Sequence, residues 1–306
     1  MVVASDSNLI YYSADPCAVD RKYDHFPTSF TNATYMINLA ILKSYQNAGV
    51  TLCGKNLYGA PSDRNPDVEL HESLPYVSWE LNHYRAIVDL MGHRDLGGKT
   101  FLYLVDGLWG CKRHPDPVQP PVLWSMSPFN NDYPSSLFAS QDPVAIDSVG
   151  LDFARTQWRQ EWNPKCGNSV DDYMHEAALA NNPPSGTFYG PDYPAGDPRR
   201  TRLQNLGVHE HWNDANDKLY TRNLGTGDGI ELVSVYTWTC TELLAGDVTV
   251  DCKVDEEDLA TMASNWLVPD ANFNQGNLDG QGRVDFLDFD IMGDDWYKCN
   301  RSWPDL

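Results

Sequence analysis

The sequence predicts an α/β core, a loop-rich extension of that core, and a small helical module at the C-terminal end. Three observations support this division. In residues 1–158, short apolar stretches typical of strands alternate with helical patterns. Residues 159–243 are rich in Pro, Asn, Asp and Gly, which favour loops. In residues 244–306, one pattern of oxygen-bearing side chains followed by a helical pattern occurs twice.

Four units make up the predicted core. The apolar stretch from Tyr35 to Leu42 predicts a buried strand, and a second strand-like unit covers residues 48–59. Apolar residues at helical spacing predict a helix from Val77 to Met91. A third unit, Thr100 to Gly107, is again an apolar strand. These strands and helices alternate, which is typical of an α/β sheet.

The fourth unit, residues 137–153, predicts a strand followed by a helix. Pro143 suits the first turn of that helix, and Asp142 is placed to cap it. Beyond the core, the stretch from Ile230 to Thr239 predicts one more strand that returns from the loop-rich extension.

A set of polar and small residues recurs at the ends of these core units: Asn38, Lys43, Thr51, Lys55, Asn56, Gly59, Asp106, Asp142, Pro143, Val144, Ala145 and Asp147. Over roughly residues 30–155 this combination resembles the uncharacterised family called domain of unknown function 362. That family usually has another α/β half before this point, so the resemblance implies a core that is incomplete at its N-terminus. The family's activity is not established, and the iron–sulfur motifs of some members are missing here.

Five charged residues of the core are candidate catalytic residues. They are Lys43, Lys55, Asp106, Asp142 and Asp147. If these side chains converge, two lysines and three carboxylates would bind an anionic substrate or share acid–base catalysis. The alternative is structural: Asp142 would only cap a helix, and Lys55 would only brace a loop.

The alternate histidines His209 and His211 are a weaker signal. They could present two ring nitrogens on one face of a strand. A metal site needs at least a third ligand, and no neighbouring residue supplies one at a known spacing. The alternative is that both rings pack and form hydrogen bonds in a loop.

Charge and composition exclude some functions. The net charge is −21, and residues 245–306, with 14 acidic and 4 basic residues, account for −10 of it. Nucleic acid is therefore not an expected partner, because no basic stripe is present. No apolar run approaches the ~18 residues of a membrane span. Ten Trp and sixteen Tyr would suit stacking on carbohydrate, although core packing explains them equally well.

The repeated pattern near the C-terminus has the spacing of two calcium loops. A twelve-residue calcium loop supplies oxygen ligands from positions 1, 3, 5, 7, 9 and 12. At these positions the first loop has Asp247, Thr249, Asp251, Lys253, Asp255 and Asp258, and the second has Asn277, Asp279, Gln281, Arg283, Asp285 and Asp288. The basic residue at position 7 would contribute its backbone carbonyl. A solvated acidic surface with chance turns is the alternative, but it would not place an amphipathic helical pattern after both loops.

A duplicated loop with an exiting helix and Asp at position 12 resembles the dockerin module. The resemblance implies two bound Ca²⁺ ions and docking to a cohesin-like or other protein receptor. In that family the module is usually attached to a carbohydrate-active enzyme. Cys252 stands at position 6, where Gly is expected and a positive φ would cost about 1 kcal/mol. Because Asn277 and Gln281 replace acidic residues, the second site should bind calcium more weakly.

The sequence therefore predicts a secreted or cell-surface protein, either extracellular or periplasmic, whose calcium module docks to a partner. Residues 1–6 show no export signal, which we attribute to a missing N-terminal segment. A disulfide between Cys252 and Cys299 would fit an oxidising compartment. Two functions of the core are open: a tethered enzyme acting on polysaccharide or another polymer, and a non-catalytic ligand-binding adaptor.

Overall fold

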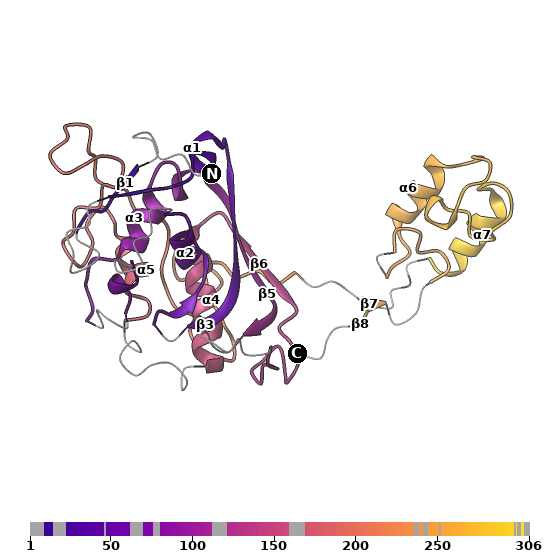
Figure 1. Cartoon of the computed structure of the whole chain (residues 1–306). Coiled ribbons are helices and arrows are strands. Elements are labelled where there is room, and N and C mark those ends of the chain that lie inside the picture. The colour runs from indigo at the N-terminus through magenta and orange to yellow at the C-terminus, as the bar shows by residue number, and fades with distance from the viewer. Residues whose placement is uncertain are drawn as a thin grey trace. The chain divides into compact units, whose positions relative to one another are not determined.

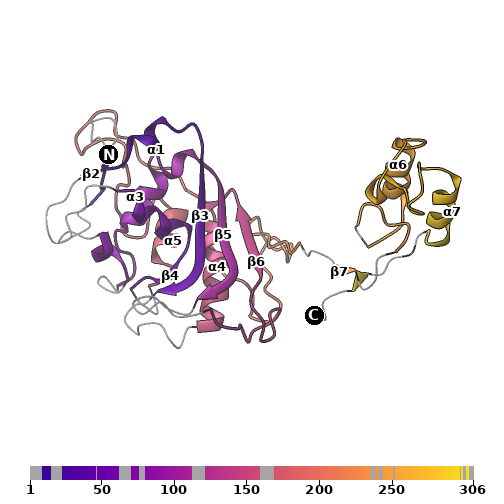
Figure 2. The ribbon, with the colours of Figure 1, turned by 45° about the vertical axis from the view of Figure 1, so that its right-hand side comes forward.

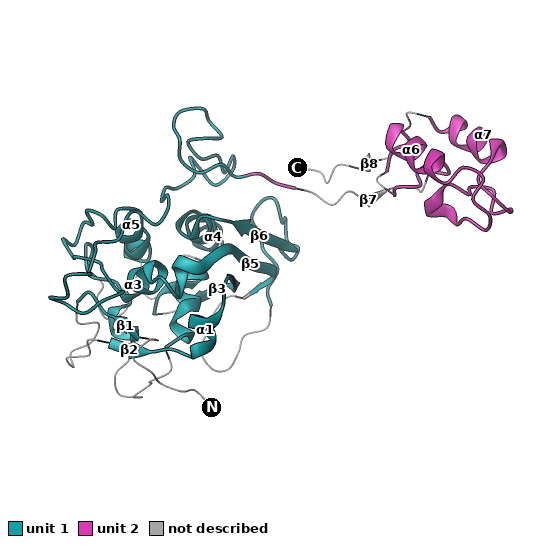
Figure 3. Ribbon diagram, turned by 90° about the horizontal axis from the view of Figure 1, so that it is seen from above, with its two compact units in different colours: residues 1–232 teal, residues 233–306 magenta. Residues whose placement is uncertain are grey.

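A computed structural model describes residues 9–14, 23–45, 47–61, 70–75, 80–111, 121–158, 169–235, 239–240, 244–250, 252–296, 298 and 301–302. The chain forms two compact units, Met1–Leu232 and Val233–Leu306 (Figure 3).

A four-stranded mixed sheet forms one layer of the first unit (Figure 1). Its strands, in spatial order, are β4 (Gly49–Thr51), β3 (Met36–Tyr45), β5 (Thr100–Cys111) and β6 (Ser136–Ser140). The central pair β3 and β5 is parallel, whereas β4 and β6 run antiparallel to their neighbours. A separate two-stranded sheet joins β1 (Leu9–Tyr11) to β2 (Tyr23–His25). The predicted α/β core is therefore confirmed.

Helices cover one side of this sheet (Figure 2). They are α2 (Cys53–Asn56), α3 (Ala86–Gly92), α4 (Pro143–Trp158) and α5 (Asp172–Ala178), while the short α1 (Thr28–Asn32) precedes β3. The longest of them, α4, packs against β3, β5 and β6. The hydrophobic core lies between these helices and the sheet.

Strand β3 is buried on one face only. Ala40 and Leu42 face the helices and are 3% and 0% exposed. The residues that alternate with them, Ile37, Leu39 and Ile41, are 55%, 57% and 55% exposed. The sequence predicted this strand correctly, but the expectation that it is buried throughout was wrong for this face.

The helix predicted from Val77 to Met91 is shorter than expected, and α3 begins only at Ala86. Before it, Asn82 has a left-handed φ of 61°. The backbone N–H groups of Asn82 and His83 donate to the Asp172 carboxylate over 2.8 and 3.3 Å, so this segment is fixed by a side chain instead of helical bonds. Residues 76–79 lie outside the described part of the chain.

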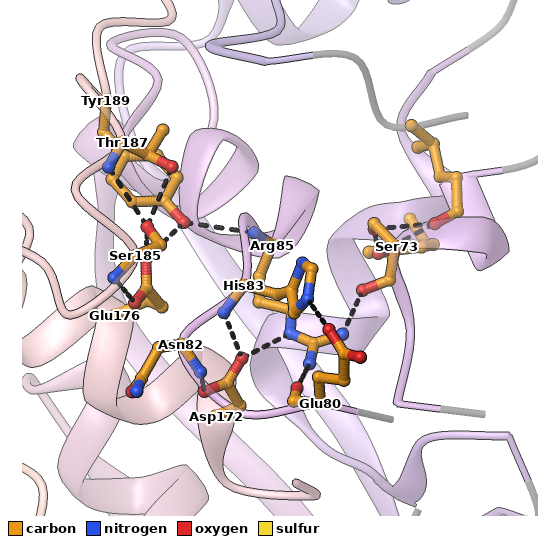
Figure 4. Close-up of polar contacts among 12 residues, drawn as sticks. Ser73, Glu80, Asn82, His83, Arg85, Asp172, Glu176, Ser185, Thr187 and Tyr189 are labelled. Carbon is orange, nitrogen blue, oxygen red and sulfur yellow. Dashed lines mark hydrogen bonds and ion pairs between the residues drawn. The ribbon is translucent and has the colours of Figure 1, made fainter. Parts of the chain in front are cut away.

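A buried arginine fixes this segment to α5 (Figure 4). Arg85 is 1% exposed, and its Nε lies 2.7 Å from Oδ2 of Asp172. Its Nη1 and Nη2 donate to the backbone carbonyls of Ser73 and Glu80 over 2.8 and 2.9 Å. The charge is thus paired and hydrogen-bonded, as a buried guanidinium requires.

The predicted loop-rich extension, residues 159–243, contains α5, and after that helix the described chain to Val235 has neither helix nor strand. The strand predicted over residues 230–239 is wrong for residues 230–235. Side chains occupy the place of a partner strand: Leu232 N donates to Oδ1 of Asn223 over 2.9 Å, and Ile230 N donates to the Glu210 carboxylate.

The second unit contains α6 (Glu256–Ser264), α7 (Phe286–Asp294), a short 3₁₀ helix (Phe273–Gln275) and the paired strands β7 (Thr239–Cys240) and β8 (Arg301–Ser302). Because β7 and β8 pair, the unit is not purely helical as the sequence suggested. It has a small apolar core of its own, formed by Val248, Val254, Met262, Ala271, Val284 and Met292. No helix among the described residues combines the length and apolar character that crossing a bilayer requires.

Candidate functional site

The first repeated loop encloses its position-12 carboxylate. Asp258 is fully buried. Its Oδ1 accepts hydrogen bonds from Thr249 N and Oγ1 over 3.0 and 2.9 Å, and its Oδ2 accepts from Asp255 N over 2.9 Å. Asp255 in turn caps α6 by accepting from Glu257 N, so both side chains form a capping box at the start of the helix.

The second loop has the same arrangement. Asp288 is fully buried. Its Oδ1 accepts from Leu278 N and Asp279 N over 2.6 and 3.0 Å, and its Oδ2 accepts from Asp285 N over 2.8 Å. Asp285 caps α7 as Asp255 caps α6. The two position-12 carboxylates therefore point into their own loops.

The position-1 side chains are also buried. Asp247 is 0% exposed, and its Oδ2 accepts from Cys252 N over 2.7 Å. Asn277 is 6% exposed, and its Nδ2 donates to the carbonyl of Ala271 over 2.8 Å. Its Oδ1 is buried and has no hydrogen-bond partner among the described residues. An unsatisfied buried acceptor of this kind is well suited to a cation.

Backbone conformation repeats at the same loop positions. Position 4 has φ of 60° at Val250 and 69° at Gly280, and position 6 has 70° at Cys252 and 75° at Gly282. The positive φ expected at Cys252 is therefore observed, in a residue that lacks the freedom of glycine. Cys252 is disulfide-bonded, and Cys299 lies outside the described residues.

The remaining predicted ligand positions are less enclosed. Gln281 and Arg283 are exposed, and Gln281 N donates to Oδ1 of Asp279 over 2.8 Å. Lys253 Nζ lies 3.6 Å from the carboxylate of Asp255. Asp251, at position 5 of the first loop, lies outside the described residues.

In the core, Asp142 has the capping role that the sequence predicted. Its Oδ1 accepts from Val144 N and Ala145 N, each over 2.8 Å, at the start of α4. Its Oδ2 accepts from Val208 N over 2.9 Å. One carboxylate thus closes the helix end and holds the loop-rich extension against it.

Asp147, in the second turn of α4, is fully buried and fixes α2. It accepts from Cys53 N and Gly54 N over 2.8 Å each, and from the Tyr173 hydroxyl over 2.7 Å. Burial raises the pKa of Asp147 to about 6, although these hydrogen bonds act in the opposite direction.

The other three catalytic candidates lie on separate elements. Lys55 Nζ lies 3.2 Å from Nε2 of His71. Asp106 accepts from the backbone N–H of Leu108 over 2.9 Å. Lys43 is half-buried on β3. Among the described residues, no hydrogen bond or ion pair joins any two of the five candidates, and their catalytic role stays a prediction.

The part of the chain that contains these residues matches the model of a known family. Residues 11–152 match the family model described as Domain of unknown function (DUF362). The match covers the whole sheet and most of α4, and it includes all five catalytic candidates, so the resemblance predicted for the core is confirmed. The DUF362 match does not extend to the second unit. No curated protein and no solved structure matches the chain.

Proposed function

We propose that the second unit is a dockerin-like attachment module that binds two Ca²⁺ ions and docks to a protein receptor outside the cell. The observation that carries this proposal is the matched geometry of residues 247–258 and 277–288. In both loops the position-12 carboxylate is buried and points inward, the position-9 Asp caps the exiting helix, and positive φ angles occur at positions 4 and 6.

The donor chemistry of the loops supports calcium. Carboxylate, amide and carbonyl oxygens are the ligands that this hard cation prefers. Asp258 and Asp288 are each 0% exposed and accept hydrogen bonds from their own loops, and a bound cation would further offset the cost of burying these charges. The Oδ1 atom of Asn277 is a further oxygen that a cation would satisfy.

An apolar surface supports the docking role. Phe286 and Leu287, in the first turn of α7, are 78% and 64% exposed. Phe286 also lines an apolar hollow, together with Leu259, Met262, Ala263, Trp266 and Phe289. Exposed apolar patches of this kind mark protein interfaces. Because the equivalent residues of α6 are Glu256 and Glu257, the two helix starts differ in chemistry, and we expect a receptor to bind in one orientation.

Calorimetric titration of the whole chain with Ca²⁺ tests the calcium sites. We expect two bound ions in the parent protein. Asp258→Asn should remove the first site and Asp288→Asn the second, because each substitution removes a buried charged ligand. Asp290→Asn is the matched control: this exposed carboxylate of α7 lies outside the loop, so both sites should remain. Absence of calcium uptake by the parent, or two intact sites in both loop variants, would overturn the proposal.

Such a module would attach the α/β core to the receptor. The convergence of Lys43, Lys55, Asp106 and Asp142 that would favour an enzyme is not observed among the described contacts. Asp142 instead accepts hydrogen bonds from the backbone N–H groups at the start of α4 and from that of Val208 in the loop-rich extension. Two functions of the core therefore stay open: a tethered enzyme acting on polysaccharide or another polymer, and a non-catalytic ligand-binding adaptor.

A further inference from the structure

Three side chains from two distant segments meet beside α4. Asp171 immediately precedes α5, and His209 and His211 come from the loop-rich extension. One potential ligand atom of each lies within 4.8 Å of the other two. Asp171 and His211 are 40 residues apart in the chain, which is why sequence spacing alone did not reveal a third ligand for the two histidines.

The hydrogen bonds of His209 leave one ring nitrogen available as a ligand. The Ser148 hydroxyl donates its single proton to the carbonyl of Val144 over 2.7 Å. It therefore accepts from Nδ1–H of His209, at 2.8 Å. Nε2 then has a lone pair, and this buried atom has no hydrogen-bond partner among the described residues. An orphaned imidazole nitrogen of fixed tautomer is a ready metal ligand.

His211 is oriented in a similar way by a buried carboxylate. Its Nδ1 lies 2.7 Å from Oδ1 of Asp152, which is 3% exposed. Asp152 is itself fixed, because its Oδ2 accepts from Trp212 N and the Tyr220 hydroxyl, each over 3.0 Å. Pairing one ring nitrogen with a carboxylate directs the other nitrogen toward a metal and increases its basicity. The Nε2 atom so directed lies 3.2 Å from Oδ2 of Asp171.

We propose that Asp171, His209 and His211 bind one divalent transition-metal ion at a site independent of the calcium loops. Two imidazole nitrogens and one carboxylate suit Zn²⁺, and also Fe²⁺. Three protein ligands leave coordination positions open for water or a substrate oxygen, as in catalytic metal sites. The site would give the core a reaction centre outside the five residues predicted from the sequence.

A cationic side chain already lies against two of these ligands. Nη2 of Arg155 donates to Oδ2 of Asp171 over 2.7 Å, and Nη1 lies 3.2 Å from Nε2 of His211. The guanidinium and a metal ion therefore compete for the same atoms. The Arg155 side chain is 23% exposed, so it can turn toward solvent when an ion binds.

Titration with Co²⁺, followed by visible absorption, tests the site. The whole chain is kept in excess Ca²⁺ so that any calcium loops are filled. We expect uptake of one equivalent of Co²⁺, which Zn²⁺ displaces, with Fe²⁺ as a second competitor. His209→Ala and Asp171→Asn should abolish the signal. Ser148→Ala, which removes the orienting hydrogen bond but none of the three ligands, should weaken binding by roughly 10- to 100-fold. His83→Ala is the control, because this exposed histidine pairs with Glu80 at 2.8 Å and should leave binding unchanged.

A gain-of-affinity variant keeps the test decisive if a loss variant fails to fold. Arg155→Ala removes the competing guanidinium and should bind Co²⁺ more tightly than the parent. An unchanged spectrum and stoichiometry in His209→Ala would overturn the proposal, as would the absence of Co²⁺ uptake by both the parent and Arg155→Ala. Calcium titration of the same variants separates this result from the proposed attachment function.

Discussion

Single buried carboxylates determine much of this structure. Asp142 could be predicted as a helix cap, because the cap and the following proline are adjacent in sequence. The role of Asp147 could not, because its partners Cys53 and Gly54 lie 94 and 93 residues away. Sequence pattern reveals local hydrogen bonding, whereas the partner of a buried charge depends on how distant elements pack.

The pH dependence of stability should reveal the buried state of Asp147. Its folded pKa of about 6 exceeds the ~3.9 of an exposed Asp, so the folded protein binds this proton more tightly than the unfolded chain. The resulting stabilisation is complete below about pH 4 and is lost as the pH rises through about 6. Asp147→Asn mimics the neutral acid. The parent should therefore lose roughly 1–3 kcal/mol of unfolding free energy relative to this variant between pH 4 and 7.

Denaturant unfolding of the first unit at several pH values measures this difference. Asp106→Asn, which alters a half-exposed carboxylate on β5, is the matched control. A stability difference between the parent and Asp147→Asn that stays constant from pH 4 to 7 would contradict the assignment.

The ion pair of Arg85 and Asp172 should be essential for the first unit. Arg85→Met leaves the Asp172 carboxylate buried without its charge partner, which typically costs about 3–5 kcal/mol. The pair of Arg94 and Asp95, at 3.5 Å, gives a contrast, because the Arg94 side chain is 44% exposed and Asp95 also pairs with Lys99 at 2.8 Å. Arg94→Met should therefore cost less than about 1 kcal/mol. Urea unfolding measures both. Equal midpoints for the two variants would show that the buried pair contributes no more than the partly exposed one.

At the scale of elements, period and propensity predicted the strands of the main sheet better than the start of α3. β3 and β5 lie where long apolar runs predicted them, and the five-residue β6 lies where a strand was predicted before the helix start at Asp142 and Pro143. The prediction of a helix before Ala86 was wrong, because the backbone N–H groups of Asn82 and His83 donate to Asp172, which lies on a distant element. Tertiary contacts override local periodicity in such a case.

The two proposed calcium loops should differ in their affinity for Ca²⁺, because their side chains carry different charges. The first has Asp at positions 1 and 5, where the second has Asn277 and Gln281. Gln281 is exposed, so Gln281→Asp adds a charged ligand without disturbing a buried contact. We expect the affinity of the second site to rise on the order of tenfold, because ligand charge tunes calcium binding. Asn274→Asp, which adds the same charge outside the loop, should change it much less. Equal calorimetric gains in both variants would indicate a general electrostatic effect.

At the scale of the whole molecule, the sequence predicted the α/β core and a second unit with repeated loops. The mixed order of the sheet was not predictable, because strand order depends on contacts between residues far apart in the chain. The cluster of Asp171, His209 and His211 was missed for the same reason. The duplicated loops could be recognised because all the proposed ligands of each lie within twelve consecutive residues.

Amide hydrogen exchange of the whole chain, with Ca²⁺ and after its removal by a chelator, tests the central claim most directly. If calcium holds the second unit together, chelation removes the protection of α6 and α7, since binding and folding of such loops are coupled. Protection of β3 and β5 in the first unit should not change. Equal protection of α6 and α7 in both conditions would contradict the account.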